Sequence, residues 1–323
     1  LSESMSEKNV VQNKAEAHRG RVIVFGYGAL AAAAVTALLS AGAEVIAVVA
    51  PSNRSGDDVD FIKDFACTAG IPVLVQPPRK TIAPFVQDLK RLDPDVIVVW
   101  SYPMILPPDV IEVPREGTVN VHGGLLPEYR GGHVMQWAII NGESETGVAL
   151  HYMDEGIDTG PVIAQRRFPI ERDDDAATVR EKLKEAGMAL LKEWWPAISQ
   201  GRAPREKQDE ATAKYHRLRT IDDGLINWHA SATEVCNLVR ALVRPWPGAF
   251  TILNKKKLVI WKCRLLVQET SGVPGLVVQV DAQGARVCTR DRDVLIETAE
   301  LDGERMTGLD LKRIMQAGTC LGA

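Results

Sequence analysis

The stretch RVIVFGYGAL (residues 21–30) decides the fold, because an apolar run of strand length stops there at two glycines and passes into a helix-forming segment. That segment, AAAAVTALLSAGA (residues 31–43), is rich in alanine and ends near Gly42, which is typical of a helix terminated by a glycine. A short apolar run followed by a helix is the first half of a β–α–β unit. We therefore expect a parallel sheet whose first strand begins at residue 21.

The same alternation continues toward residue 100. Three more apolar runs, EVIAVVA (44–50), IPVLV (71–75) and DVIVVW (95–100), are separated by helical patterns near residues 59–68 and 82–92. Strands that are apolar throughout are buried on both faces, as in a parallel sheet covered by helices. The sequence predicts an α/β domain with a Rossmann-like, doubly wound, mostly parallel sheet.

Residues 21–205 are expected to form this domain. GTVNVH (117–122), TGVALHYMD and VIAQRRFPI read as further strands, with a short helix near residues 134–140 between the first two. A long helix then closes the domain, with a Thr178/Glu181 capping box at its start. Its apolar positions fall on one stripe: Val179, Leu183, Leu190 and Trp194.

A second, smaller domain is expected at residues 231–323, after a polar linker at residues 206–230. A helix from about Thr233 to Val243 is followed by short strands with turn residues between them, which favours an OB-like β-barrel. This part is only mildly basic, and its run of three lysines at 255–257 is expected at a hairpin tip.

The gross composition describes an ordinary globular protein. The chain has 323 residues, 46% hydrophobic and 25% charged, with a net charge of −4 that gives no general reason to bind a polyanion. Five scattered cysteines without a C-x-x-C pair favour a reducing, cytoplasmic location and argue against a zinc site, so no metal is expected. No membrane span is expected. Residues 1–20 read as a mobile polar tail, with Met5 as a candidate start.

The stretch GYGALA (residues 26–31) matches the permissive dinucleotide-binding pattern at a strand-to-helix turn. That pattern also needs an acidic residue at the end of the second strand to bind the ribose hydroxyls. Ala50 and Pro51 occupy that place here. The favoured interpretation is a pair of tight-turn glycines, with nicotinamide binding as the alternative.

Polar side chains follow two other strands. Asn120 and His122 end one strand and, being two residues apart, face the same side of the sheet. Asp158 follows another strand, between Gly156 and Gly160. Because the carboxyl ends of parallel strands line one crevice, we expect these three side chains to converge there.

An amide, an imidazole and a carboxylate can stabilise an oxyanion, exchange a proton near neutral pH and hold the imidazole. This set suits acyl transfer without a covalent intermediate, since neither segment has a nucleophilic Ser or Cys at its centre. The structural alternatives are an inert core histidine and a solvated acidic turn.

These residues also resemble the folate-dependent formyltransferases, a family that includes methionyl-tRNA and amino-sugar formyltransferases. The resemblance covers nearly the whole chain, because INW, SATEV and PWPGAF (between residues 226 and 250) are similar to the linker and second domain of the longer members. Its motifs in the first domain are Asn120-Val-His122, Leu125-Leu126-Pro127, Tyr129-Arg130-Gly131, Gly142-Glu143, Thr146-Gly147-Val148 and residues 153–160.

The resemblance implies that Asn120, His122 and Asp158 are catalytic and that 10-formyltetrahydrofolate is the donor. Asn120 and a protonated His122 would stabilise the oxyanion, while Asp158 aligns the histidine and helps to take the amine proton. Two loops would line the donor pocket; the implied contacts are Ser101, Tyr102, Met104, Ile105, Leu106, Leu125, Leu126, Pro127, Tyr129, Arg130 and Gly131.

The acceptor is open. Gly124 stands where the family usually has Ser, and the segment after Arg130 also departs from the tRNA enzymes. The loop PSNRSGDDVD (51–60), with one Arg and three Asp, lacks the basic insertion of the tRNA enzymes and would repel tRNA. A small amine is therefore expected, a nucleotide-linked amino sugar first and an amino acid such as hydroxyornithine second. Methionyl-tRNA, a non-catalytic folate- or nucleotide-binding protein, and homo-oligomer formation remain alternatives to be tested.

Overall fold

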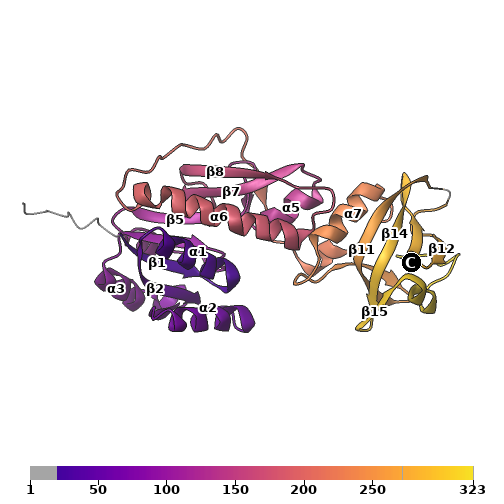
Figure 1. Cartoon of the computed structure of the whole chain (residues 1–323), viewed down its shortest axis with the longest axis horizontal. Helices are drawn as coiled ribbons and strands as arrows, with labels where there is room; N and C mark the ends of the chain where they lie inside the picture. Colours follow the sequence, from indigo (N-terminus) through magenta and orange to yellow (C-terminus); the bar gives the residue numbers. More distant parts are fainter. Residues whose placement is uncertain (1–19, 271, 323) are drawn as a thin grey trace, which may run out of the picture.

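The computed structural model describes residues 20–270 and 272–322, and residues 1–19 of the expected tail lie outside this range. An α/β domain and a β-rich domain lie at opposite ends of the long axis (Figure 1). The strands of the α/β domain are β1 (Arg21–Gly26), β2 (Glu44–Pro51), β3 (Val73–Gln76), β4 (Val96–Trp100), β5 (Gly117–His122), β6 (Arg130–Gly131), β7 (Glu145–Tyr152) and β8 (Val162–Pro169). Its helices are α1 (Gly28–Ser40), α2 (Asp57–Thr68), the 3-10 helix η1 (Arg79–Thr81), α3 (Ile82–Leu92), α4 (Pro108–Ile111), α5 (Val134–Ile140) and α6 (Ala176–Ile198).

The main sheet has seven strands in the order β3-β2-β1-β4-β5-β7-β8. Strands β1 to β5 run parallel, which confirms the predicted doubly wound sheet. Strand β7 runs antiparallel to β5, and β8 runs antiparallel to β7. The sheet is therefore mixed at the edge that carries the polar residues.

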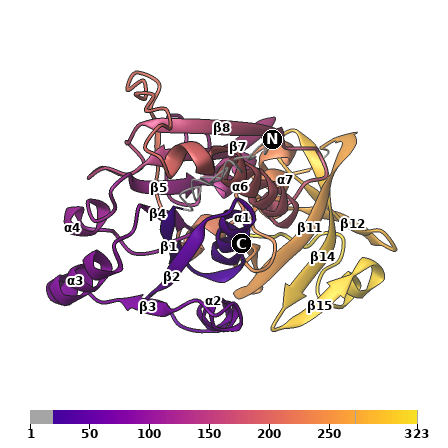
Figure 2. The ribbon, with the colours of Figure 1, turned by 60° about the vertical axis from the view of Figure 1, so that its left-hand side comes forward.

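Helices cover both faces of this sheet (Figure 2). Successive residues of a strand face opposite sides, so Val22 and Val24 of β1 pack with α1, α2 and α6 on one face. Ile23 and Phe25 pack with α3 on the other face. This two-sided burial explains why the strands are apolar throughout.

The glycines at the end of β1 have a packing role. A Cβ built on Gly26 would lie 2.5 Å from the carbonyl oxygen of Trp100 and 2.7 Å from Cβ of Ala31. Gly28 adopts a φ of 64°, which favours glycine. Both observations agree with the tight-turn interpretation of GYGALA.

The capping box predicted for α6 was wrong. The helix is capped by Asp175, whose side chain accepts hydrogen bonds from the backbone N–H groups of Ala177 and Thr178 at 2.9 and 3.0 Å. Thr178 is the reciprocal partner in this box, so Glu181 has no part in it. The predicted apolar stripe is confirmed: Val179, Leu183 and Leu190 are buried, and Trp194 is partly buried and packs against the same core, next to the buried Trp195.

The second domain is a six-stranded antiparallel sheet with α7 (Ala232–Ala241) packed against β11 and β14, and it confirms the expected small β-domain. Residues between the domains form β9 (Tyr215–His216), paired with β6, and the 3-10 helix η2 (Ile221–Gly224). The C-terminal strands are β10 (Ala249–Leu253), β11 (Lys256–Glu269), β12 (Val277–Asp281), β13 (Gly284–Cys288), β14 (Arg292–Leu301) and β15 (Glu304–Thr307), followed by the 3-10 helix η3 (Gly308–Arg313). Asn254 and Lys255, both with positive φ, form the turn between β10 and β11, so the three lysines do lie at a hairpin tip.

Candidate active site

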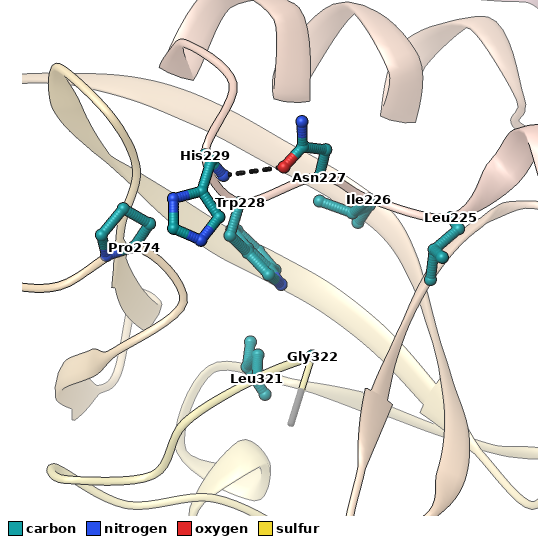
Figure 3. A pocket seen from close by; sticks show the side chains of 8 residues that line it. All are labelled: Leu225, Ile226, Asn227, Trp228, His229, Pro274, Leu321 and Gly322. Carbon is teal, nitrogen blue, oxygen red and sulfur yellow. Dashed lines mark hydrogen bonds between the residues drawn. The ribbon is translucent and has the colours of Figure 1, made fainter.

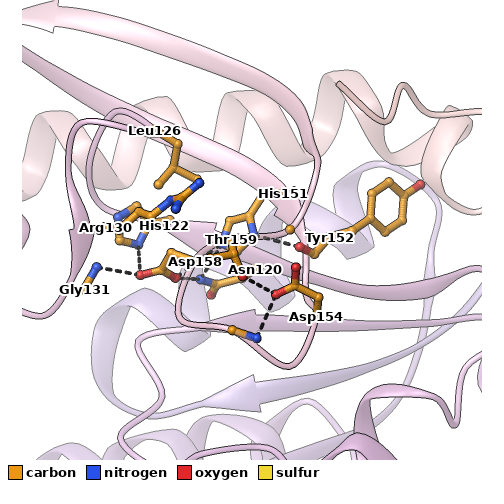
Figure 4. A network of polar contacts seen from close by, with 12 residues as sticks. Asn120, His122, Leu126, Arg130, Gly131, His151, Tyr152, Asp154, Asp158 and Thr159 are labelled. Carbon is orange, nitrogen blue, oxygen red and sulfur yellow. Dashed lines mark hydrogen bonds and ion pairs between the residues drawn. The ribbon is translucent and has the colours of Figure 1, made fainter. Parts of the chain in front are cut away.

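Strand β5 presents Asn120 and His122 on one side, and Asp158 lies against both (Figure 4). The amide nitrogen Nδ2 of Asn120 donates to Oδ1 of Asp158 at 3.4 Å. Nδ1 of His122 lies 3.5 Å from Oδ2 of the same carboxylate. The three side chains that the sequence pattern singled out are therefore brought together.

They converge by a different route from the one expected for parallel strands. Because β7 is antiparallel to β5, its last residue, Tyr152, pairs with Val119 in the interior of β5 rather than with its carboxyl end. The backbone N–H of Met153 then donates to the carbonyl oxygen of Thr118 at 2.8 Å. The loop after β7 folds back along β5, and this return carries Asp158 to Asn120.

The Asp158 loop is a close-packed turn. Asp158 itself has a φ of 55°, a left-handed conformation that is uncommon outside glycine, asparagine and aspartate. Asp154 Oδ1 accepts from the Gly156 N–H at 3.0 Å and from the Thr159 hydroxyl at 2.5 Å. A Cβ on Gly160 would lie 1.8 Å from the Tyr152 carbonyl oxygen, so only glycine fits there. The two glycines and Asp154 thus shape the turn that presents Asp158.

The carboxylate of Asp158 is held in its ionised form. Oδ2 accepts from the backbone N–H of Gly131 at 2.9 Å. Burial alone raises the pKa of Asp158, but His122, His151 and the Gly131 N–H together outweigh it and leave that pKa well below its usual range. The carboxylate is therefore charged throughout the physiological pH range.

His122 has an acceptor at each ring nitrogen. Nε2 lies 2.6 Å from the carbonyl oxygen of Tyr129, and a carbonyl can only accept, so Nε2 carries a proton. Nδ1 faces Asp158. Burial lowers the pKa of His122 below its usual range, and His151 lowers it further, while Asp158 and the Tyr129 carbonyl oppose this shift. The ring is neutral at rest, and both acceptors are in place to stabilise it when it gains a proton.

A fourth polar residue, His151 of β7, was missed by the sequence interpretation. Its Nδ1 lies 2.8 Å from the carbonyl oxygen of Tyr152, and its Nε2 lies 3.1 Å from Asn120 Nδ2 and 3.5 Å from Asp158 Oδ1. The side chain is 1% exposed. The available signal was a histidine near the end of an otherwise apolar strand, but its partner depends on the antiparallel register of β5 and β7.

The loop at residues 123–131 follows β5 directly and wraps the site. Gln165 of β8 clamps it: its Oε1 accepts from the Leu126 N–H at 2.8 Å and its Nε2 donates to the Leu126 carbonyl at 2.9 Å. The Tyr129 hydroxyl donates to Glu143 at 2.7 Å, and its ring stacks on His216 with centroids 4.5 Å apart. Leu125 and Leu126 are buried, while Pro127, Tyr129 and Gly131 are partly exposed.

The loop at residues 101–108 follows the neighbouring strand β4. The ring of Tyr102 contacts Phe25 edge-on at 5.4 Å, and burial raises its pKa. Leu106 is buried, Ser101 and Met104 are partly exposed, and Ile105 is 85% exposed.

Arg130 differs from its neighbours in this loop. Its side chain is fully buried and directed at residues 208–215: Nε donates to Gln208 at 3.0 Å, and the two terminal nitrogens donate to Glu210 at 2.9 and 2.7 Å. Nη1 also donates to the Tyr215 hydroxyl at 2.9 Å. The guanidinium therefore has a structural set of partners, and a ligand could meet only the main chain here.

A cavity of about 340 Å³ lies apart from this network, in the region that joins the domains (Figure 3). Within it the His229 N–H donates to Asn227 Oδ1 at 3.0 Å. Its lining consists of Leu225, Ile226, Asn227, Trp228, His229, Pro274, Leu321 and Gly322. None of these residues contributes to the cluster around Asp158, so the cavity does not mark the candidate active site.

Among the described residues, no helix combines the length and the apolar composition needed to cross a bilayer.

Comparisons with known proteins place the chain in a family. Residues 19–194 match the family model described as formyl transferase, and residues 220–315 match that described as formyl transferase, C-terminal domain. A methionyl-tRNA formyltransferase from Caldanaerobacter subterraneus subsp. tengcongensis is 36% identical over 294 residues, which cover 90% of this chain and 94% of that protein.

Solved structures share the fold at lower identity. WlaRD, a sugar 3N-formyl transferase crystallised with dTDP and 5-N-formyl-THF, has a TM-score of 0.66 at 21% identity and covers 89% of this chain and 99% of its own. An N-formyltransferase from Helicobacter canadensis, in complex with folinic acid and dTDP-3-aminofucose, has a TM-score of 0.66 at 22% identity and covers 85% and 98%. The chain belongs to the folate-dependent formyltransferase family and is an N-formyltransferase.

Proposed function

We propose that the protein transfers the formyl group of 10-formyltetrahydrofolate to the primary amine of a phosphate-bearing small molecule, with a nucleotide-linked amino sugar as the first candidate. The observation that carries the proposal is the convergence of Asn120 and His122 on one carboxylate: Asp158 lies 3.4 Å from Asn120 Nδ2 and 3.5 Å from His122 Nδ1. An amide donor, a proton-exchanging imidazole and a fixed carboxylate are the groups that formyl transfer between two nitrogens needs.

The reaction can be written from these groups. The acceptor amine attacks the formyl carbon, and the carbonyl electrons move to oxygen. There the developing oxyanion shares the Asn120 N–H that contacts Asp158 at 3.4 Å in the resting site. The family resemblance implied a protonated His122, but burial lowers the pKa of this ring, so we assign the neutral ring the role of taking the proton that the amine nitrogen releases. Asp158 stabilises the resulting imidazolium. The proton passes to the folate nitrogen as the bond from that nitrogen to the formyl carbon breaks. The products are the N-formylated amine and tetrahydrofolate.

The donor would lie between the loops at residues 101–106 and 125–131. Backbone groups and the side chains of Tyr102, Met104 and Ile105 offer a partly apolar surface on one side, and the Leu126 loop faces it from β5. The solved relatives named above hold 5-N-formyl-THF or folinic acid, which supports a folate as the donor. In this arrangement Arg130 supports the loop and only its main chain faces the donor.

The acceptor would enter past a basic aromatic rim formed by His133, Trp137, Arg217 and Arg219. The two guanidinium carbons each lie 5.7 Å from the centre of the Trp137 ring. The Trp137 indole N–H donates to the Arg217 carbonyl at 2.9 Å, and the Arg219 N–H donates to His133 Nδ1 at 3.0 Å. An indole beside guanidinium groups suits a base and a phosphate group.

The rim is joined to the catalytic cluster through the residues after β5. The Gly131 N–H donates to Asp158, and the Gly132 N–H donates to the His216 carbonyl, next to Arg217. Burial, with the charges of Arg219 and Arg54, lowers the pKa of His133, so the positive charge of this edge comes from arginine rather than from histidine. Arg217 is paired with Asp223, which leaves Arg219 as the guanidinium of the rim without a carboxylate partner of its own among the described ion pairs. A phosphate bound there would hold its attached amine near His122.

Methionyl-tRNA is the second candidate acceptor, and the 36% identity over 90% of the chain favours it. Against it stand three aspartates at residues 57, 58 and 60, which occupy the first turn of α2 after the loop at 51–56. Carboxylates are stabilised at a helix N-terminus, and their negative charge opposes the binding of a polyphosphate chain. The charge of this loop makes the small acceptor the better candidate.

The test is a mass-spectrometric assay of formyl transfer to nucleotide-linked amino sugars, hydroxyornithine, free amino acids and methionyl-tRNA. The proposal expects the largest kcat/KM on a nucleotide-linked amino sugar. If only methionyl-tRNA is formylated, the acceptor is methionyl-tRNA and the proposed small acceptor is wrong. Product on hydroxyornithine alone would contradict the role of the rim as a phosphate-binding edge.

A further inference from the structure

The carboxylate of Asp158 is placed by main-chain contacts of its own loop. Asp158 has a left-handed φ of 55°, and the chain makes a tight turn at Gly160. Because the backbone conformation of this turn sets the direction of the Asp158 side chain, small movements of the loop would displace the carboxylate. The carbonyl oxygens of Asp158 and Gly160, on either side of Thr159, both accept from one donor: Nε2 of Gln208, at 2.8 and 2.7 Å. One buried carboxamide thus holds both ends of the turn.

The orientation of that carboxamide is fixed by Arg130. A glutamine amide has one accepting end and one donating end, whereas a guanidinium only donates. Arg130 Nε donates to Gln208 Oε1 at 3.0 Å, so Nε2 must face the two carbonyls. Gln208 is 6% exposed and Arg130 is fully buried, so water cannot substitute readily for either partner.

Arg130 is in turn held by residues from the same segment. Glu210 accepts from both terminal nitrogens of the guanidinium, and the Tyr215 hydroxyl accepts from one of them at 2.9 Å. Strand β6, which contains Arg130 and Gly131, pairs with β9. The Val162 and Glu206 backbones exchange two hydrogen bonds, at 2.8 and 2.9 Å, which fasten the start of the segment to β8.

Residues 206–216, which we call the strap, therefore hold both loops that meet at Asp158. Gln208 holds the carbonyls of the Asp158 turn, and β9 holds β6, whose Gly131 N–H donates to the Asp158 carboxylate. We infer that Gln208, oriented by Arg130, is a positioning residue for Asp158 in formyl transfer, an inference that rests on the function proposed above. The strap thereby becomes part of the machinery that sets the distance from Asp158 to His122.

Two substitutions test this role. Gln208→Met keeps the length of the side chain but removes both polar ends, and Gln208→Glu keeps the contact with Arg130 but has no N–H to donate. Both variants should lower kcat by on the order of 10- to 100-fold, because small displacements of catalytic groups have effects of this size. The KM for 10-formyltetrahydrofolate should change by less than about twofold, since the donor loops are held by other contacts. Gln200→Met, at an exposed glutamine, is the matched control.

A second readout does not depend on turnover. Asp158 raises the pKa of His122 against the effects of burial and His151, so a displaced Asp158 should lower it further. NMR titration of the His122 ring in the folded variants measures this shift. If the wild-type protein formylates no amine, the proposed function fails, but the titration still decides whether Gln208 positions Asp158.

The inference is overturned if folded Gln208→Met retains both the wild-type kcat and the wild-type pKa of His122, or if only KM changes. It is also overturned if Gln208→Glu behaves as wild type. The size of the side chain and its contact with Arg130 would then be enough for normal activity, without the N–H that donates to the turn. Should neither variant fold, Glu210→Gln provides the test, since the Glu210 side chain is 65% exposed. Glu210→Gln should lower both kcat and the pKa of His122, but by less than the Gln208 variants do. If both kcat and this pKa equal the wild-type values, the inference is again overturned.

Discussion

Asn120 and His151 face each other across the antiparallel strands β5 and β7, with 3.1 Å between Nδ2 of the amide and Nε2 of the ring. Because a carbonyl oxygen only accepts, His151 Nδ1, which lies 2.8 Å from the Tyr152 carbonyl, carries a proton, and in the tautomer with this single proton Nε2 accepts. The Asn120 nitrogen therefore faces two acceptors, His151 Nε2 and Asp158 Oδ1, and its orientation is determined. The carboxamide is fixed before any substrate binds.

This relationship predicts that His151→Phe lowers kcat by about fivefold, because one hydrogen bond that orients Asn120 is worth roughly 1 kcal/mol. Phenylalanine preserves the buried ring but removes the acceptor. Steady-state kinetics should show little change in the KM for the folate donor. His229→Phe, at the exposed histidine of the domain junction, serves as the control. A kcat for His151→Phe equal to that of the control would contradict the orienting role.

The acid side of the pH–rate profile should report His122. The proposed reaction uses the neutral ring as a proton acceptor, so kcat/KM should fall as the pH decreases through its pKa, which lies below the ordinary value of about 6.5. Asp158→Asn removes the charge that raises this pKa. The acid limb should therefore move to lower pH, while the maximal rate falls on the order of 100-fold because the imidazolium loses its partner. The amine substrate titrates identically in both proteins, so an acid limb that stays in place or moves to higher pH would count against this account.

The basic aromatic rim should govern the acceptor alone. Trp137→Leu removes the indole that lies beside Arg217 and Arg219, so it should raise the KM for a phosphate-bearing acceptor by about tenfold and leave the donor KM within about twofold. Trp261→Leu, at a partly buried tryptophan of β11, is a matched control in the second domain. Equal effects on both substrates would mean that Trp137 only supports the fold of the loop.

The close contact between α6 and β4 predicts a stability effect far from the chemistry. A Cβ on Gly187 would lie 2.5 Å from two ring atoms of Trp100, so Gly187→Ala should lower the free energy of unfolding by about 1–3 kcal/mol. Trp100→Phe removes those ring atoms, and in its presence the alanine should cost less. Chemical denaturation of the four proteins in this double-mutant cycle measures the coupling. If the two substitutions have additive effects on the free energy of unfolding, α6 relieves the clash by moving away from Trp100.

Local patterns in the sequence predicted most of the fold. The helices at residues 82–92 and 134–140 have the expected bounds, and the apolar runs form the parallel strands, because burial on both faces leaves a clear local signature. The antiparallel direction of β7 has no comparable signature in the local sequence. Its strand pattern is the same in either direction, so the position of His151 opposite Asn120 could not be read from spacing.

The candidate site was predicted in part for the same reason. Asn120, His122 and Asp158 stand out because polar residues interrupt apolar strands and glycines flank them. Gln208 lies in a polar, charged stretch where a solvated residue is the normal expectation. Its burial depends on Arg130, a residue 78 positions away along the chain, so only the structure shows the contact.

The most direct test of the account is transfer of an isotope-labelled formyl group from 10-formyltetrahydrofolate to a nucleotide-linked amino sugar, followed by mass spectrometry. Wild-type protein and the control Asn254→Asp, at the β10–β11 turn, should give labelled product at similar rates. Asn120→Asp, which exchanges an amide donor for a carboxylate of the same size, should be slower on the order of 100- to 1,000-fold. Near-normal transfer by folded Asn120→Asp would contradict the assignment of the active site.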